Sequence, residues 1–143
     1  MTDFPDIGIA VRSLLLSDNE IAGMVVNRIS ADRMYQGSEV PAVAFYVIST
    51  IAEDCLSGAV GIDMARIQFE CYAETRKEAG NLANLIRLKV AGFRGVQDGV
   101  VIKGVEQSSG QGYGLDRSEV GGDNGRPFVR QDFTFSFNSL TKV

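Results

Sequence analysis

The chain has 143 residues, of which 45% are hydrophobic and 22% are charged, and its net charge is −4 at neutral pH. This length suits one compact domain with a single core, and this composition argues against global disorder. An acidic chain is a poor candidate for gripping nucleic acid, because that affinity rests on Lys and Arg side chains that neutralise phosphates.

The first 25 residues predict a pair of short helices. Pro5 fits a first helical turn, where its missing N–H is not needed, and Asp18 can cap the second helix. Residues 29–40 are polar and mixed, which predicts a connection without regular structure. The apolar residues of the two helices recur at helical spacing: Ile7, Val11, Leu14 and Leu15 in the first, and Ile21, Met24 and Val25 in the second.

The next part of the chain predicts an antiparallel hairpin. Residues Pro41–Ser49 are rich in strand formers and apolar on both faces, as in a strand covered on both sides. Residues 54–61 predict a turn, and Met64–Tyr72 alternates apolar and polar residues like a half-buried strand. Cys71 falls on the apolar side of that strand, and we expect both Cys55 and Cys71 to be free thiols.

A capped helix follows, and it is the strongest structural signal in the sequence. Thr75 and Glu78 have the spacing of a capping box, in which each side chain satisfies a backbone N–H of the first turn. Gly92 or Gly95 can end this helix. One apolar stripe runs along it, made of Ala79, Leu82, Ala83, Ile86, Val90 and Phe93.

The C-terminal part predicts two strands separated by a long Gly-rich arm. Val100–Gln107 is the first strand, and Val129–Ser139 is the second, with Phe133, Phe135 and Phe137 on one face. Residues 108–125 between them are polar and longer than an ordinary connection, which is typical of a functional loop. The sequence therefore predicts one α+β domain over residues 1–143, with an antiparallel sheet of about four strands, helices packed on one face and the order ααββαββ.

Catalytic and metal-binding signals are weak. The chain has no histidine, which removes the commonest general base and the commonest zinc ligand. The glycines of Gly110–Gly114 lack the lysine of a phosphate loop. The carboxylate pairs Glu53–Asp54 and Asp116–Glu119 fall in expected surface loops, where solvated charge is the ordinary state. We therefore predict a protein that is not an enzyme and that holds neither a cofactor nor a metal.

The Gly-rich arm offers candidate interface residues. Tyr113 and Leu115 form an apolar pair within it, and aromatic residues are favoured at the centres of interfaces. The pair either docks onto a partner or folds back onto its own core, and the sequence does not separate these two arrangements. With their charged neighbours, the candidate interface consists of Tyr113, Leu115, Asp116, Arg117 and Arg126.

The order of features resembles that of a known family. Landmarks after the helix pair are Asn27-Arg28-Ile29, Tyr35 and the run Pro41–Tyr46, followed by Arg66–Thr75, the capped helix and the Phe-rich strand. From about Ile7 to Asn138 the chain resembles the small tail-completion proteins of bacteriophages, including the tail terminators of long-tailed phages.

This resemblance implies a structural role in a virion. Members of the family form a hexameric ring on the end of the tail-tube protein, stop its polymerisation and join it to the head–tail connector protein. DNA passes through the lumen of the ring without sequence-specific binding, and no catalytic residues are implied. We would then expect the protein in the virion tail or neck, and in the host cytoplasm during assembly, without a membrane partner.

Other functions stay open on sequence alone. A tail-tube or connector protein of the same particle also forms rings, and a ring protein that stacks is not separated from one that terminates. A small hydrolase that uses Asp and Lys, or a bacterial regulatory binding module, is a further alternative.

Overall fold

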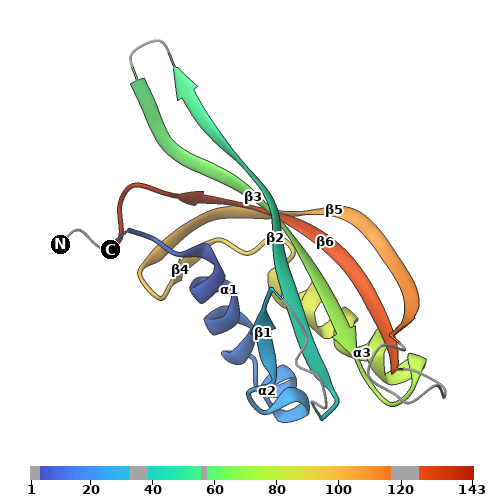
Figure 1. Cartoon of the computed structure of the whole chain (residues 1–143). Helices are drawn as coiled ribbons and strands as arrows, with labels where there is room; N and C mark the ends of the chain where they lie inside the picture. Colours follow the sequence, from blue (N-terminus) through green and yellow to red (C-terminus); the bar gives the residue numbers. More distant parts are fainter. Residues whose placement is uncertain (1–3, 33–38, 56–57, 117–125) are drawn as a thin grey trace.

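The computed structural model describes residues 4–32, 39–55, 58–116 and 126–143, in which helices cover one face of a curled six-stranded sheet (Figure 1). The strands lie in the order β1-β2-β3-β6-β5-β4, with β1 and β2 parallel and all other neighbours antiparallel. The elements are α1 (Ile7–Leu16), α2 (Asn19–Val25), β1 (Ile29–Ala31), β2 (Ala42–Cys55), β3 (Gly58–Tyr72), α3 (Arg76–Val90), β4 (Gly95–Gln97), β5 (Val100–Asp116) and β6 (Arg126–Asn138).

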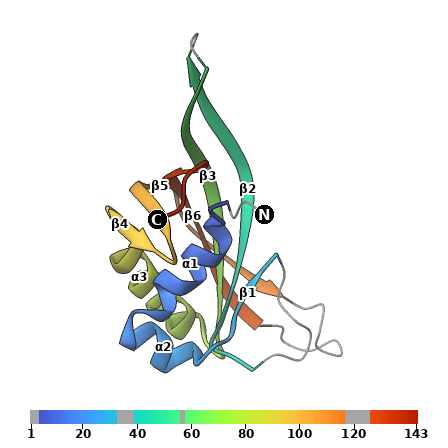
Figure 2. The same cartoon turned by 90° about the vertical axis from the view of Figure 1, so that its left-hand side faces the viewer.

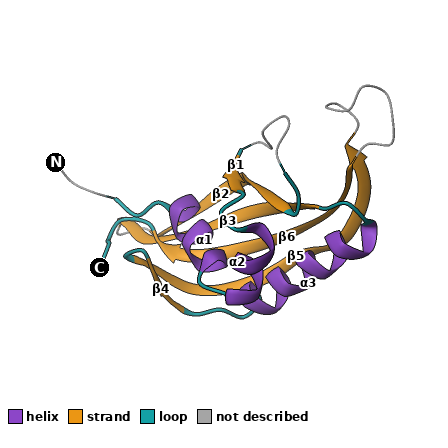
Figure 3. Ribbon diagram, turned by 90° about the horizontal axis from the view of Figure 1, so that it is seen from below, coloured by secondary structure: helices purple, strands orange, loops and turns teal. Residues whose placement is uncertain are grey.

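The three helices begin at side chains that cap them, and the caps at Asp18 and Thr75 are those that the sequence predicts. The Asp6 carboxylate accepts hydrogen bonds from the first backbone N–H groups of α1, and Asp18 does the same for α2. The Thr75 hydroxyl accepts from the backbone N–H of Glu78 at 3.1 Å, so the N-cap predicted for α3 is confirmed. Each cap satisfies a donor that has no partner inside the helix. Figure 3 shows all three helices on the same face of the sheet.

The core lies between these helices and the sheet, and its centre is aromatic. The Phe69 ring on β3 lies 5.8 Å from the Phe133 ring and 6.5 Å from the Phe135 ring, both on β6. The predicted apolar face of β6 is confirmed, because Phe133, Phe135 and Phe137 are all buried. Burying one such side chain contributes roughly 1.5–3 kcal/mol to folding.

Cys71 is a buried free thiol in this core, as predicted. Burial, together with the neighbouring carboxylate of Glu70, raises the pKa of the Cys71 thiol. The thiol therefore stays protonated in the folded protein and is a poor nucleophile, because the thiolate is the reactive form. The side chain of Cys55 lies outside the described residues.

The predicted four-stranded antiparallel sheet with the order ααββαββ is wrong. The sheet has six strands in the described residues and is mixed, because β1 pairs in parallel with β2. The sequence missed β1 and β4, which are three residues long each. Such short strands carry no measurable alternation of apolar and polar residues, so their positions depend on pairing with a longer neighbour.

The long strands also extend further than predicted. Most of the region 54–61, predicted as a turn, belongs to β2 and β3. Residues 108–116, predicted as part of the Gly-rich arm, belong to β5, while residues 117–125 lie outside the described residues. β5 stays paired with β6 through three shifts of register, and these irregularities accommodate a sequence with little strand propensity.

Among the described residues, most of β2 and most of β5 lie at the edges of the sheet without a neighbouring strand on their outer side. β1 pairs with β2 only over Val43–Phe45, and β4 pairs with β5 only over Val100–Ile102. β3 pairs with β6 only from Ile62 onward, so its first residues pair with β2 alone. The β2–β3 hairpin therefore leaves the sheet as a two-stranded ribbon, which Figure 2 shows projecting well beyond the rest of the molecule.

Candidate functional site

The described residues offer no metal site and no phosphate loop. No three His, Cys, Asp or Glu side chains among them gather closely enough to hold a metal ion. Gly110–Gly114 runs inside β5 instead of opening a helix, so the structural context of a phosphate loop is missing. None of the described helices is long and apolar enough to cross a membrane. The features that remain are surfaces.

The first surface is a cleft at one end of the molecule, where the start of α3 meets the end of β5 and the start of β6. It has a volume of about 670 Å³, which is in the range of ordinary binding pockets. Tyr113 and Leu115 are 53% and 50% exposed within it. The Arg76 guanidinium lies 4.1 Å from the centre of the Tyr113 ring, a cation–π contact that orients both side chains. The cleft is lined by Glu74, Thr75, Arg76, Tyr113, Gly114, Leu115 and Pro127.

A buried glutamine next to the cleft joins β6 to α3 and β5. The Gln131 side chain on β6 is fully buried, and its amide donates to the backbone carbonyl of Ala83 on α3 at 2.8 Å. Its carbonyl oxygen accepts from Gln111 on β5, and Gln111 also donates to Asn84 on α3. This network fixes the distance between β5 and α3, because a buried amide is stable only with its partners in place.

Close packing behind the cleft requires a glycine. Gly114 lies against the Phe128 ring so closely that a Cβ atom there would be 2.6 Å from the ring Cζ. Phe128 in turn packs against Tyr72, with ring centroids 5.3 Å apart. The glycine at 114 therefore allows β5 to approach the aromatic residues of the opposite face of the sheet.

The structure places the backbones of Tyr113, Leu115, Asp116 and Arg126 close together on the adjacent strands β5 and β6. Tyr113 and Leu115 lie on a strand and line a cleft, so they neither extend on a free arm nor return to the core. The backbones of Asp116 and Arg126 are partners in the sheet where β5 ends and β6 begins, and the Arg126 side chain is partly buried. The side chain of Asp116 and the whole of Arg117 lie outside the described residues. That these residues form an interface stays a prediction.

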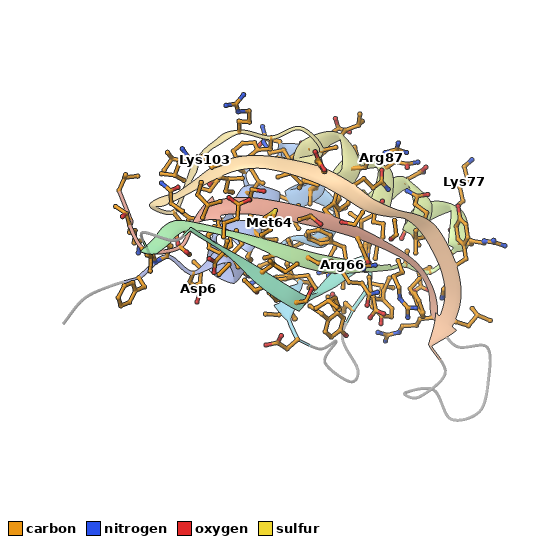
Figure 4. The ribbon with its side chains drawn as sticks, turned by 90° about the horizontal axis from the view of Figure 1, so that it is seen from above. Asp6, Met64, Arg66, Lys77, Arg87 and Lys103 are labelled. Atoms are coloured by element: carbon orange, nitrogen blue, oxygen red, sulfur yellow. The ribbon has the colours of Figure 1, made fainter. Side chains whose placement is uncertain are left out.

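Positive charge follows the cleft along α3. A groove between α3 and β5 continues from Arg76 and Lys77, and Arg87 lines its far end next to β5. Figure 4 shows Lys77 and Arg87 projecting along the same side of the molecule. Glu74 is the one acidic residue that lines these three adjoining hollows in the described part of the chain.

The second surface is the β2–β3 hairpin, which the sequence predicts, although its extension through residues 54–61 was predicted as a turn. Val47, Ile48 and Ile51 are 41%, 51% and 62% exposed on β2. Ile51 pairs across the hairpin with Met64, which Figure 4 shows on the face of the sheet opposite the helices. Residues 47–65 contain three acidic side chains, Glu53, Asp54 and Asp63, and neither Lys nor Arg. The hairpin is therefore apolar and acidic.

The third surface is the face of the sheet that carries no helices. Arg66 on β3 pairs with Asp132 on β6 at 2.7 Å, and Arg130 on β6 pairs with Glu70 on β3 at 3.0 Å. The carboxylates are nearly buried while about half of each arginine side chain is exposed. The two charges of each ion pair cancel, so the surface is polar without a strong field of either sign.

No protein-family model matches the chain, and no curated protein matches its sequence. Among solved structures, it is similar to a chain described as part of the "Virion of native gene transfer agent (GTA) particle". The two align with a TM-score of 0.68 over 91% of this chain and 92% of that chain, at 13% sequence identity. At this identity the likeness shows a shared fold.

Proposed function

We propose that this protein is a structural subunit of a phage-like virion, where it forms a ring that ends the tail tube and joins it to the head connector. The observation that carries the virion assignment is the shared fold with a chain of a gene transfer agent virion over nine-tenths of both chains. A match that includes nearly every element of both proteins argues for the same kind of part, although function depends on sites as well as on fold.

The surfaces of the molecule support an assembly role. An isolated subunit exposes an apolar hairpin and leaves long stretches of β2 and β5 at the edges of the sheet. Exposed edges and apolar patches are unfavourable in a monomer, and proteins usually cover them. A ring subunit can cover both, because its neighbours lie against it on either side.

The face of the sheet without helices suits a lumen through which DNA passes. Its arginines are already paired with Asp132 and Glu70, so phosphates would have to compete for them. The net charge of the chain is −4, which further lowers affinity for DNA. DNA would then slide past this surface without sequence-specific binding.

The terminator role rests on the resemblance of the sequence to phage tail-completion proteins. A tail-tube or connector protein of the same particle is the alternative, and the two differ in how they polymerise. Negative-stain microscopy of the purified protein, alone and mixed with tail tubes, distinguishes them. A terminator gives single rings and caps one end of each tube, whereas a tube protein gives stacks of rings. Purified protein that neither forms rings nor binds tubes would contradict the whole proposal.

We also propose that the protein is not an enzyme. The hydrolase alternative requires the carboxylates of Asp116 and Glu119, which lie outside the part of the chain whose side chains are described. A phosphatase and nuclease screen of the wild type and an Asp116→Asn/Glu119→Gln variant tests it. Activity that disappears in the variant would contradict a purely structural role.

A further inference from the structure

The two apolar surfaces lie at opposite ends of the molecule. Figures 1 and 2 show the β2–β3 hairpin projecting from one end, while the first turn of α3 and the ends of β5 and β6 lie at the other. The hairpin and the cleft therefore cannot meet within one subunit. Two different surfaces on opposite ends of identical molecules can meet head to tail, and such contacts close into rings when the rotation allows it.

The hairpin has the properties of a segment that docks. The part of the hairpin beyond Glu53 and Ile62 is a two-stranded ribbon with little stability of its own in water, and the exposed apolar residues Ile48 and Ile51 lie just before it on β2. Ile51 is 62% exposed although it is a large apolar residue paired with Met64. Burying such side chains against a partner stabilises the association and also orders the ribbon.

The cleft has the complementary properties. Tyr113, Leu115 and Pro127 are among its lining residues, and its volume of about 670 Å³ is large enough for several aliphatic side chains. Tyr113 is held in position from the helix side by the Arg76 guanidinium. Aromatic and Arg side chains that are already oriented lose little conformational freedom on binding.

The charges of the two surfaces are opposite in sign. Glu53, Asp54 and Asp63 give the hairpin a negative charge. Arg76, Lys77 and Arg87 line the cleft and its continuation along α3, against Glu74 alone among the described lining residues. The cleft also lies at the N-terminus of α3, where the helix dipole favours negative charge. Complementary potentials of this kind fix orientation and exclude wrong partners.

We propose that the β2–β3 hairpin of one copy seats in the cleft formed by α3, β5 and β6 of a second copy, with Ile51 and its apolar neighbours against Tyr113 and Leu115. Glu53 of the hairpin then faces Arg76 and Lys77. This contact deepens the proposed function, because it supplies the head-to-tail interface of the ring. Every subunit uses both surfaces once in a closed ring, so no apolar hairpin stays exposed.

A charge swap tests the contact directly. Arg76→Glu is expected to weaken self-association at least about tenfold, measured by sedimentation velocity across a concentration series. Glu53→Arg is expected to do the same, and combining the two substitutions should restore association. Both residues are exposed, so the variants should fold normally. Loss of association in both single variants with no recovery in the double variant would overturn the pairing of these two surfaces.

A second variant removes the apolar part of the contact. Ile51→Asp should abolish self-association, while the matched control Leu88→Asp should leave it unchanged, because Leu88 is 82% exposed on α3 outside the cleft. Circular dichroism checks that both variants keep the fold. Equal association in the wild type and Ile51→Asp would overturn the proposal.

Disulfide cross-linking tests whether the hairpin of one copy lies in the cleft of another. Cys55 ends β2 at the tip of the hairpin, and Leu115→Cys adds a thiol in the cleft. Mild oxidation should link copies of Leu115→Cys into covalent multimers, and these should be absent from Cys55→Ser/Leu115→Cys. Ile9→Cys, exposed on α1, is the control position and should give no multimers.

The outcomes separate this inference from the proposed function. Rings that form and bind tail tubes, but are insensitive to the hairpin and cleft variants, would overturn the contact and leave the virion role standing. Hairpin variants that keep rings but no longer bind tubes would assign the hairpin to the tube protein instead, which also overturns the contact. A wild-type protein that forms no rings and binds no tubes would overturn both.

Discussion

The helix-covered part of the sheet and the projecting hairpin use the same kinds of residue for different purposes. Ile67 on β3 is fully buried under the helices, whereas Ile48 and Ile51, on the paired strand β2, are more than half exposed. The two parts are continuous, since both are built from β2 and β3. The buried part stabilises the subunit, and the exposed apolar residues fit the contact with a second copy that we propose.

The largest effect on the free energy of unfolding is expected from a substitution in the core. Ile67→Ala should lower the free energy of unfolding by about 2–5 kcal/mol, because it removes buried methyl groups and leaves a cavity beside Phe69 and Phe133. Urea denaturation followed by circular dichroism measures the loss. A change below about 1 kcal/mol would contradict the tight packing that the structure gives this part of the sheet.

The next effect is expected at the buried amide that joins the core to the cleft. Gln131→Leu removes the donor to the Ala83 carbonyl and the acceptor for Gln111. We expect a loss of about 1–3 kcal/mol, the usual range for a buried group that loses its partner. Hydrogen exchange should also become faster at the backbone amides around Gln111. Unchanged exchange there would show that α3 and β5 are held together by other contacts.

The sequence predicted the core and the base of the hairpin, but it missed the extension of the hairpin. The caps at Asp18 and Thr75 and the alternation before Tyr72 are local patterns, and the structure confirms the elements that they predict. The hairpin extension through residues 54–61 lacks the alternation of a half-buried strand, so the sequence predicted a turn there. Its register comes from cross-strand pairing, which sequence alone does not reveal.

The candidate site was also predicted only in part from the sequence. Tyr113 and Leu115 were predicted from their position among glycines, and the structure brings them together with Arg76, which comes from a distant part of the chain. The glycines themselves suggested a loop, yet pairing with β6 keeps Gly112 and Gly114 in a strand. Tertiary pairing outweighed weak local propensity at this point.

A smaller effect should appear at high pH, from Cys71 in the core. Because burial raises the pKa of this thiol, the folded protein keeps its proton when the unfolded chain has lost it. Stability is therefore fully present below the ordinary thiol pKa of about 8.5 and falls above it, by up to about 1.4 kcal/mol per pH unit. Cys71→Ala should not show this component, so the stability difference between wild type and variant should shrink from pH 8 to pH 10. A constant difference would contradict a buried neutral thiol.

The smallest effect on stability is expected in the hairpin, and it sharpens the comparison most. Ile48→Ala should change the free energy of unfolding by no more than about 0.5 kcal/mol, as is usual for an exposed position. The same variant should weaken self-association measurably. Ile67→Ala, at temperatures where it is folded, should associate like the wild type. A loss of stability similar to that of Ile67→Ala would mean that the hairpin belongs to the subunit core.

We propose that the protein forms a single ring at the junction of tail and head. Counting its copies per purified particle, by quantitative mass spectrometry against the tail-tube protein, tests this most directly. We expect the copy number of one ring in every particle, whatever the length of the tail. A copy number that grows in proportion to tail length, or a complete particle that lacks the protein, would contradict it.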